Sequence, residues 1–319
     1  MAILLLAANI LLQQNSSNIN KNDVIIKEKN LSERLKNILS EFGIDDNFIK
    51  ESKFVGKRAD QEIIKFKVQV PKDLSIPEIL LDVHRSFAKD SLKINSFEKK
   101  KSGKTKLEIK SGALTLLQAE FDYSKNYARD KGNIAFIIYD VSPANQSTIQ
   151  LIESPTKLNF LVRPEKTIQP FLETIRKNRQ QYSILIDDDI TEQSYKLGGN
   201  YSEKRIITVL KTLVTEYNIA VCFIVDKNSD FYGSKGYEEF KRELLKRNIK
   251  LFTTSDFVNL VNDENLPIVF NEEMDSLKNV KSKIFLLDEE TLLALSPEIL
   301  KYQKRGYRVI PGSAFLNED

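Results

Sequence analysis

Apolar and polar positions follow two different patterns along the chain, and the change falls near residue 130. Beyond that point, short apolar runs are separated by stretches with helical spacing. The clearest run covers residues 134–139, which have almost no polar character and lie between Gly132-Asn133 and Asp140. A segment this short, apolar on both faces and rich in β-branched and aromatic residues, predicts a strand buried on both sides. Pro143 then requires the chain to turn.

The same rhythm continues to the end of the chain. We expect strands at residues 134–140, 157–162, 183–187, 219–225, 249–253, 282–287 and 307–310, and helices at 165–177, 202–217, 237–247, 255–261 and 289–304. Helices that alternate with doubly buried strands indicate parallel pairing and right-handed crossovers. The predicted fold is α/β, a distorted seven-stranded parallel (β/α) barrel over residues 131–319. No GxGxxG or Walker glycine pattern follows a strand, which argues against a nucleotide-binding fold.

Residues 31–130 have a different pattern, which predicts a small α+β domain. Residues 32–42 carry apolar side chains at helical spacing, and Gly43 marks the end of that helix. A second helix is expected at residues 75–89, with Ser75 as its N-cap. Alternating apolar and polar residues predict strands at 62–70, 92–98, 104–110 and 113–123.

The first residues form a further segment, 1–30. Residues 2–12 are almost wholly apolar, and residues 13–23 are polar and rich in Asn. As a helix, the apolar part would rise only about 16 Å, roughly half of a bilayer core. We interpret the segment as the end of a membrane anchor or signal followed by a polar tether, with a short docked helix as the alternative. The first interpretation predicts an extracytoplasmic or periplasmic protein that contacts a membrane only through this segment, and the second a cytoplasmic one.

Charge and rare residue types exclude several classes of function. The chain has 48 Lys and Arg and 45 Asp and Glu in 319 residues, and this near balance predicts no nucleic-acid partner. The single cysteine, Cys222, cannot form an internal disulfide. The single histidine, His84, excludes any site that needs two histidines from one chain.

Carboxylates follow several predicted strands of the second domain. Asp140 ends the first strand, three aspartates at residues 187–189 end the third, and Asp226 ends the fourth. The carboxyl ends of parallel strands form the functional edge of such folds, so these side chains are expected to meet. They repel one another unless a cation or hydrogen-bond donors compensate, and Mg²⁺, Ca²⁺ or Mn²⁺ suit oxygen ligands. Capping of helices and turns is the alternative, above all for Asp256 and Asp288.

Several motifs, taken in order, resemble the divergent polysaccharide deacetylase family. That family opens its barrel with a strand ending Asp-Asp, where this chain has Tyr139-Asp140. Residues 184–189 stand where the family has an apolar strand and His-x-Pro-Met-Glu, and residues 226–231 where it has Asn-Asn-His-x-Gly-Ser. Phe252-Thr-Thr-Ser255 stands at the family's Phe-x-Asp-Ser, and residues 306–313 resemble its closing Val-Pro-x-Ser strand. The resemblance covers about residues 60–316 and implies a distorted (β/α) barrel related to metal-dependent carbohydrate deacetylases.

The departures from these motifs concern the catalytic groups. By position, Tyr139 replaces the aspartate that acts as base in the family, and Asp140 keeps the metal aspartate. A tyrosine with an ordinary pKa of about 10 is a poor base at neutral pH. The resemblance therefore implies a degenerate site, with Asp187 and Asn228 in place of the two metal histidines. The candidate residues are Tyr139 at the base position, Asp140, Asp187 and Asn228 as the metal set, and Asp188, Asp189, Asp226 and Tyr232 as ligand-binding residues.

Three functions of different class stay open. The favoured one is a pseudoenzyme of the cell envelope that needs no cofactor and either binds a glycan, such as an envelope polysaccharide or a peptidoglycan fragment, or has a structural role. The alternative is an active carbohydrate de-N-acetylase or hydrolase that uses Asp140, Asp187 and Asn228 with Mg²⁺, Ca²⁺ or Mn²⁺. A protein-interaction module is suggested by aromatic residues in the loops of the acidic edge, which could stack on sugar rings or on a partner. Packing within the loops is the other explanation for these residues, Tyr195, Tyr201, Phe231, Tyr232 and Tyr237.

Overall fold

The structure is a computed structural model that describes residues 21–55, 62–90, 92–99, 103–127, 129, 131–277 and 281–316. The chain divides into two compact units, Met1–Arg129 (unit 1) and Asp130–Asp319 (unit 2). The apolar segment interpreted as an anchor, residues 2–12, and most of the tether lie outside the described residues. Within the described ranges, no helix combines the length and the apolar character that a membrane span requires.

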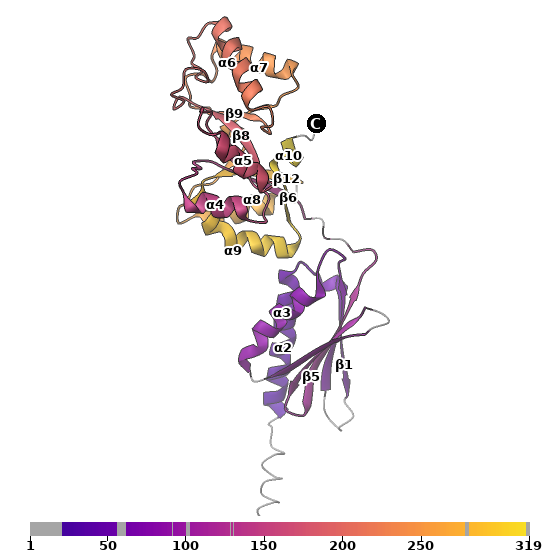
Figure 1. Ribbon diagram of the computed structural model, residues 1–319. Helices are drawn as coiled ribbons and strands as arrows, with labels where there is room; N and C mark the ends of the chain where they lie inside the picture. The colour runs from indigo at the N-terminus through magenta and orange to yellow at the C-terminus, as the bar shows by residue number, and fades with distance from the viewer. Residues whose placement is uncertain are drawn as a thin grey trace, which may run out of the picture. The chain divides into compact units, whose positions relative to one another are not determined.

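Unit 1 is a five-stranded mixed sheet with two helices on one face (Figure 1). Its strand order is β1–β2–β5–β4–β3, with β2 and β5 parallel and the other neighbours antiparallel. Side chains from both layers, including Leu35, Phe66, Val83 and Phe121, form its core. The elements are α2 (Lys21–Glu41), η1 (Asp46–Phe48), β1 (Ile49–Val55), β2 (Glu62–Val70), α3 (Ile76–Phe87), η2 (Ala88–Asp90), β3 (Lys93–Glu98), β4 (Thr105–Ser111) and β5 (Leu114–Tyr123).

The α+β character predicted for this unit is confirmed, with two differences in detail. Helix α2 begins at Lys21 and not at residue 32, because the Lys- and Glu-rich residues ahead of the apolar stripe are themselves good helix formers. Strand β1 was not predicted, because its apolar residues Ile49, Phe54 and Val55 do not alternate. Gly43 ends the first helical segment as predicted and has a left-handed φ of 67°.

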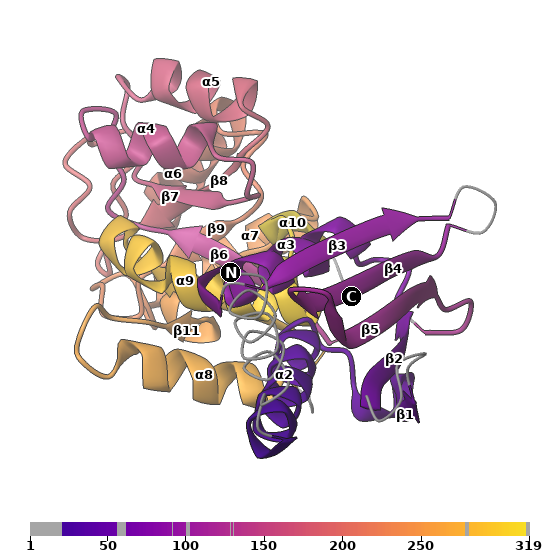
Figure 2. The ribbon, with the colours of Figure 1, turned by 90° about the horizontal axis from the view of Figure 1, so that it is seen from below.

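Unit 2 is a sheet of parallel strands curled into a half-barrel, with helices outside it (Figure 2). Seven strands follow the order β10–β9–β8–β7–β6–β12–β11, and β13 pairs with β6 beside this path. The predicted α/β fold with a curled seven-stranded parallel sheet is confirmed. The strands are β6 (Asn133–Ile138), β7 (Asn159–Val162), β8 (Gln181–Ile186), β9 (Phe223–Val225), β10 (Leu251–Thr253), β11 (Val258–Asn259), β12 (Ser282–Leu287) and β13 (Arg308–Val309). The helices are α4 (Gln146–Glu153), α5 (Gln169–Lys177), α6 (Glu203–Glu216), α7 (Lys235–Lys246), α8 (Leu266–Ser276), α9 (Glu289–Arg305) and α10 (Gly312–Leu316).

The short connection between β10 and β11 explains the curl. These strands are the two ends of the path, yet only residues 254–257, which include the 3₁₀ turn η3 (Thr254–Asp256), separate them. Seven strands side by side in a flat sheet would place its edges about 29 Å apart, at 4.8 Å for each step. The connection spans at most about 17 Å. The sheet therefore has to curl until its edges approach one another.

This region also contains the main error of the secondary-structure prediction. The helix predicted at residues 255–261 is wrong, because η3 and the short parallel strand β11 occupy that stretch. Thr253 and Asp256 form a capping box at the start of η3, with Asp256 Oδ2 accepting from Thr253 N at 2.7 Å. Asp288 is the N-cap of α9, as predicted, and accepts from Thr291 N at 2.7 Å.

The inner face of the curled sheet follows the two-residue period of its strands. Ile137, Leu161, Ile224 and Leu286 fill the middle of the interior together with Cys222. The opposite faces of the same strands pack against the helices in a larger core. Every second residue of each strand faces the interior. The same alternation therefore shows which side chains lie at the amino end of the interior and which lie at its carboxyl end.

A neutral hydrogen-bond network closes the amino end of the interior. Asn159 Nδ2 donates to Ser183 Oγ at 2.9 Å, and that hydroxyl lies 3.3 Å from Cys222 Sγ. Helix α10 covers this network: Ser313 N donates to Gln181 Oε1 at 3.0 Å, and Phe315 packs against the interior core. A Cβ atom on Gly312 would lie 2.9 Å from Asn159 Nδ2, so the helix approaches closely because this residue is glycine.

Candidate functional site

A cavity of about 430 Å³ opens at the carboxyl ends of the parallel strands. Its floor is apolar and includes Leu161, Leu185 and Leu286 from the interior core, and Phe257 forms part of its wall. Its rim is polar, and most of its polar side chains come from the residues that directly follow the strands. The volume and the mixture of an apolar floor with few convergent polar groups are typical of small-ligand sites.

The strand period decides which residues reach this cavity. Leu161 and Leu185 face the interior, so Arg163 and Asp187, two residues further on, face the cavity. In the same way, Tyr139 follows the interior residue Ile137 by two positions and Asp226 follows Ile224, so both face the cavity. Asp140 breaks the alternation: it has a left-handed φ of 54°, an uncommon conformation for a residue other than glycine, and this turn brings its side chain to the same rim.

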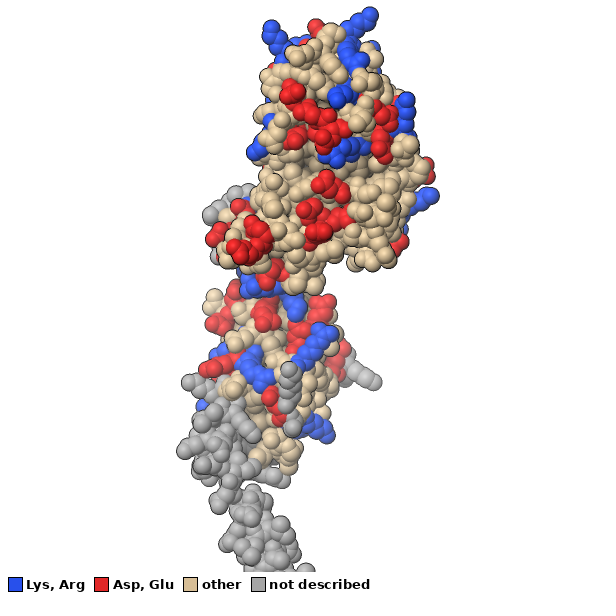
Figure 3. Space-filling model, turned by 90° about the vertical axis from the view of Figure 1, so that its left-hand side faces the viewer, with Lys and Arg blue, Asp and Glu red and all other residues tan. Residues whose placement is uncertain are grey.

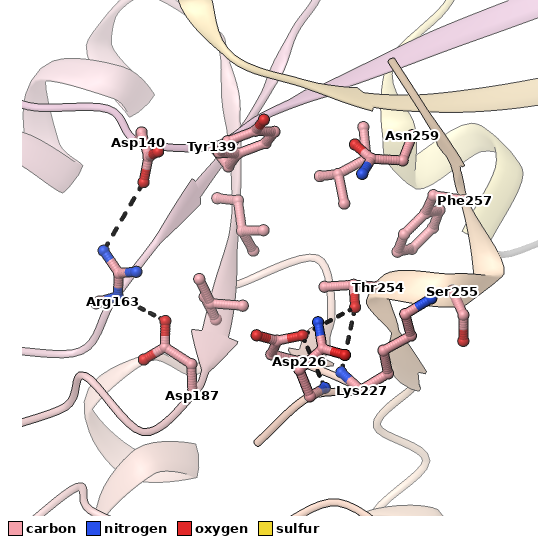
Figure 4. A pocket seen from close by; sticks show the side chains of 14 residues that line it. Tyr139, Asp140, Arg163, Asp187, Asp226, Lys227, Thr254, Ser255, Phe257 and Asn259 are labelled. Carbon is pink, nitrogen blue, oxygen red and sulfur yellow. Dashed lines mark hydrogen bonds and ion pairs between the residues drawn. The ribbon is translucent and has the colours of Figure 1, made fainter. Parts of the chain in front are cut away.

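One guanidinium group joins three of the carboxylates. Arg163 Nε donates to Asp187 Oδ2 at 2.7 Å, and Arg163 Nη2 donates to Asp189 Oδ2 at 3.0 Å. Arg163 Nη1 forms an ion pair of 3.9 Å with Asp140 Oδ1. In Figure 4 the guanidinium lies between Asp140 and Asp187 on one side of the cavity. The repulsion expected between carboxylates at this edge is thus compensated by an arginine.

Asp187 is the buried member of this group. Its side chain is 8% exposed, against 41% for Arg163. Burial raises the pKa of the Asp187 carboxyl, and the hydrogen bond and charge of Arg163 oppose this rise. Oδ1 of Asp187 is buried and has no hydrogen-bond partner among the described residues. The carboxylate therefore depends on Arg163 for its stability in the ionised form.

A second polar group fixes the loop after β9. Asp226 Oδ1 accepts from Asn228 N at 3.0 Å and from Thr254 Oγ1 at 3.3 Å. Asp188 points to the same loop and accepts from Asp230 N at 2.9 Å. The side chain of Asn228 lines the cavity, and so does that of Lys227. These bonds hold the loops after β8, β9 and β10 together at the rim.

The residues predicted for the site are brought together in part. Tyr139, Asp140, Asp187, Asp226 and Asn228 line one cavity. Asp188 and Asp189 are not among its lining residues but hold, respectively, the loop after β9 and Arg163. Tyr232 is also outside the lining and packs edge-on against Tyr237, with ring centroids 5.1 Å apart.

The aromatic residues predicted to form an interaction surface mostly belong to the core. Tyr195, Phe231 and Tyr237 are buried in the large core of unit 2, and Tyr201 packs against it. Tyr232 is the exposed member of the group. Loop packing, one of the two explanations left open for these residues, accounts for the buried ones.

Tyr139 stands beside Asp140 at the rim. Burial raises the pKa of its hydroxyl above the ordinary value, and the negative charges of Asp288 and Asp140 raise it further. The hydroxyl is therefore protonated at neutral pH and can take part in hydrogen bonds, but the phenolate that could act as a base is even less populated than in an ordinary tyrosine.

The sequence analysis missed the basic residues of the site. Arg163 follows strand β7 in the same way that Asp187 follows β8, so the rule that selected the aspartates applies to it equally. The carboxylates were expected to need a cation or hydrogen-bond donors, and Arg163 provides both from within the chain. In the space-filling view, acidic side chains gather on one face of unit 2 with basic side chains between them (Figure 3). The electrostatic potential of this surface therefore has contributions of both signs and is not uniformly negative.

The divalent ion implied by the deacetylase motifs does not fit this arrangement of side chains. No group of three or more Asp, Glu, His or Cys residues in the described ranges is placed to hold a metal ion. A cation bound between Asp140 and Asp187 would meet the Arg163 guanidinium, which already pairs with both. Like charges at this distance exclude each other in a partly buried site.

Comparisons with known proteins give distant structural similarities. No protein-family model matches the sequence, and no curated protein is significantly similar to it. One similar structure is an uncharacterized protein from Agrobacterium tumefaciens C58, with a TM-score of 0.42 and 11% identity over 60% of this chain and 92% of that one. Another is a mutant of BA3943, a CE4 family pseudoenzyme with restored enzymatic activity, with a TM-score of 0.38 and 13% identity over 75% of this chain and 98% of that one.

Proposed function

We propose that unit 2 is a polysaccharide-deacetylase-like half-barrel that binds a glycan of the cell envelope without metal-dependent deacetylation. The observation that carries the proposal is the cavity at the carboxyl ends of the strands, where an apolar floor meets hydroxyl, carboxylate, guanidinium and ammonium groups. Sugars present apolar ring faces edged by hydroxyl groups, so they suit such a lining. The order of the deacetylase-like motifs along the sequence supports the same class of ligand.

The absence of hydrolysis is inferred from two side chains. Tyr139 stands where the family has its base, and its raised pKa keeps the hydroxyl protonated. Arg163 pairs with the carboxylates that would have to bind the activating ion. The cavity has no anionic base at residue 139 and no room for the ion, so it lacks the two groups that activate water in a metal-dependent deacetylase. Its remaining polar and apolar groups can still bind a sugar.

The partner of this site is an envelope polysaccharide or a peptidoglycan fragment, in line with the extracytoplasmic location inferred from the N-terminal residues. Phe257 is only 8% exposed and lines the cavity wall with that part of its surface, and Asp226 and Asn228 offer acceptors and donors at the rim. We assign Phe257 to the sugar ring and the two polar side chains to its hydroxyl groups.

Binding and hydrolysis are tested with the full-length protein. Chitooligosaccharides and peptidoglycan fragments are titrated by calorimetry, and acetate release is measured with and without Mg²⁺, Ca²⁺ and Mn²⁺. We expect saturable binding, no acetate release, and an affinity about tenfold lower in Phe257→Ala, since one stacked ring contributes about 1 kcal/mol. Phe270→Ala also removes a buried ring from unit 2 but lies outside the cavity lining, so it is the matched control, and the folded variant keeps the affinity unchanged.

Two results would overturn this proposal. Acetate release that requires a divalent ion and disappears in Asp140→Ala would establish the hydrolase that uses Asp140, Asp187 and Asn228. No binding of any envelope glycan would leave only a structural role for unit 2.

A further inference from the structure

The carboxylates at the mouth of the half-barrel pose a problem of charge. Asp140, Asp187 and Asp189 converge within ion-pair distance of one group, the guanidinium of Arg163. Unpaired, three negative charges at this spacing would repel one another and favour protonation or displacement of the loops. The geometry gives the arginine the role that a metal ion has in many carboxylate sites.

Asp187 in particular requires the positive charge of Arg163, because its carboxylate is buried. Its side chain is almost completely enclosed, and one of its oxygens has no hydrogen-bond partner in the described part of the chain. Its compensation comes first from the Arg163 Nε hydrogen bond of 2.7 Å and from the charge of the guanidinium, and a backbone hydrogen bond from Asp189 contributes less. Removal of one partner from such a pair leaves a buried charge without compensation, which is strongly destabilising.

The second cation of the cavity does not share this role. Lys227 lines the cavity, but none of the ion pairs among the described residues involves its ammonium group. Its backbone N–H donates to Thr254 Oγ1 at 3.2 Å, so the main chain is fixed while the side chain remains exposed. A planar guanidinium can pair with several carboxylates at once, which a single ammonium group does less well.

We infer that Arg163 is a resident cation that takes the place of a divalent ion at the mouth of unit 2. The site keeps its shape without metal. In this structure Asp140, Asp187 and Asp189 are spaced around the guanidinium and not around a common ion, and once the guanidinium is removed they can close on a divalent cation. This inference goes beyond the proposed glycan binding, since it concerns the carboxylates themselves and holds whichever ligand enters the cavity.

The test compares the full-length wild type with Arg163→Ala and Arg163→Gln. Thermal unfolding is followed in EDTA and in millimolar MnCl₂, CaCl₂ or MgCl₂, and bound metal is measured after dialysis. The wild-type midpoint is expected to be the same in all conditions. In EDTA both variants unfold at least about 5 °C lower, because Asp187 has lost its partner. A divalent ion restores most of this loss and is retained at close to one per chain.

Two controls separate this effect from general changes in charge. Arg176→Ala removes an exposed arginine from α5 and is expected to change neither the midpoint nor the metal content. Adding Asp187→Asn to Arg163→Ala removes the buried charge, so it should recover stability in EDTA and abolish metal retention. With Asp187→Asn alone as the fourth protein, the wild type and these variants form a double-mutant cycle for the ion pair.

The inference fails if the wild type retains a stoichiometric divalent ion that Asp140→Ala releases. It also fails if both Arg163 variants are folded, by circular dichroism, and neither retains an ion. Should Arg163→Ala fold only when metal is present, the inference is supported. Should it fail to fold in every condition, Arg163→Gln decides, because its side chain keeps hydrogen-bond donors near Asp187.

Discussion

The two ends of the interior of unit 2 are built from the same strands and differ in almost every respect. At the amino end Asn159, Ser183 and Cys222 form a neutral network that α10 covers. At the carboxyl end Arg163 and Asp187, four residues further along the same strands β7 and β8, are charged and open to a cavity of about 430 Å³. The groups at the amino end are all neutral, although Asn159 Oδ1 is buried without a hydrogen-bond partner among the described residues. At the carboxyl end the charge of Asp187 is buried against Arg163, whose side chain is 41% exposed.

The difference assigns stability to one end and binding to the other. The network at the amino end is buried and contacted by α10, so it contributes to folding. At the carboxyl end, solvent weakens the ion pairs of the rim, since Arg163 is 41% exposed, but the same exposure leaves the charged groups available to a ligand. Changes at the amino end should therefore alter stability alone, and changes at the rim should alter ligand affinity and ion dependence.

The largest expected contrast concerns thiol reactivity at the two ends. Burial raises the pKa of Cys222 to about 12, roughly a thousandfold decrease in thiolate at any pH well below this value. At pH 8 a thiol reagent should label native Cys222 at least about a thousandfold more slowly than the protein unfolded in urea. The rates are measured by absorbance or mass spectrometry.

The matched control places a cysteine at the open end. Ser255 lines the cavity and is exposed, so Ser255→Cys in a Cys222→Ala background should react at the rate of a free thiol. Rapid labelling of native Cys222 would show that α10 opens, and the amino end would then be no more closed than the rim.

A change of stability without a change of binding is expected for Asn159→Ala. Asn159 is fully buried, and its loss removes the hydrogen bond to Ser183 and leaves a small void under α10. We expect unfolding in urea to show a loss of about 2–3 kcal/mol. Glycan affinity of the folded variant should equal that of the wild type. Equal stability, or a loss of affinity at unchanged stability, would contradict the division of roles between the two ends.

A smaller effect is expected in the pH dependence of stability. Since burial raises the pKa of Asp187 in the folded state, the native protein binds a proton more readily than the unfolded chain does between the unfolded value, about 3.9, and the raised folded value. The contribution of this carboxyl to stability is thus greatest at low pH and falls as the pH rises through the folded pKa.

Urea unfolding at a series of pH values checks this sign. Asp187→Asn should remove the decrease, and Arg163→Gln should enlarge it, because the guanidinium opposes the rise of the pKa. Asp230→Asn changes the same charge outside the cavity lining and serves as the control. A wild-type profile no steeper than that of Asp187→Asn would show that Asp187 has an ordinary pKa.

The arrangement of unit 2 could be predicted to a large extent, because its strands are apolar on both faces. Buried runs such as residues 134–139 have a pattern that solvent-exposed segments cannot share, and parallel pairing follows from the helices between them. The seven-stranded path was predicted with one strand exchanged: β13 lies beside it, and the two-residue strand β11 belongs to it. A two-residue strand has no period, so only the tertiary structure identifies it.

The site was predicted less completely, for a reason that lies in its chemistry. The sequence shows that Asp140, Asp187 and Asp226 follow strands, which is sufficient to bring them to one rim. It does not show which neighbour compensates their charge, because Arg163 pairs with residues 23, 24 and 26 positions away. Aspartate adopts the left-handed conformation more readily than most residues, but its residue type alone does not predict that conformation at Asp140, which lies in the turn after β6.

The smallest effect is expected at Tyr232, which the sequence placed among the ligand-binding candidates. Its ring is 41% exposed and contacts Tyr237 away from the cavity lining. Tyr232→Ser should change stability by no more than about 0.5 kcal/mol and glycan affinity by less than about twofold. Calorimetry beside Phe257→Ala gives the direct comparison, since both changes remove one aromatic ring. A tenfold loss of affinity in Tyr232→Ser would show that the ligand also contacts the loop after Asp226, and that the binding surface at the carboxyl end extends beyond the cavity.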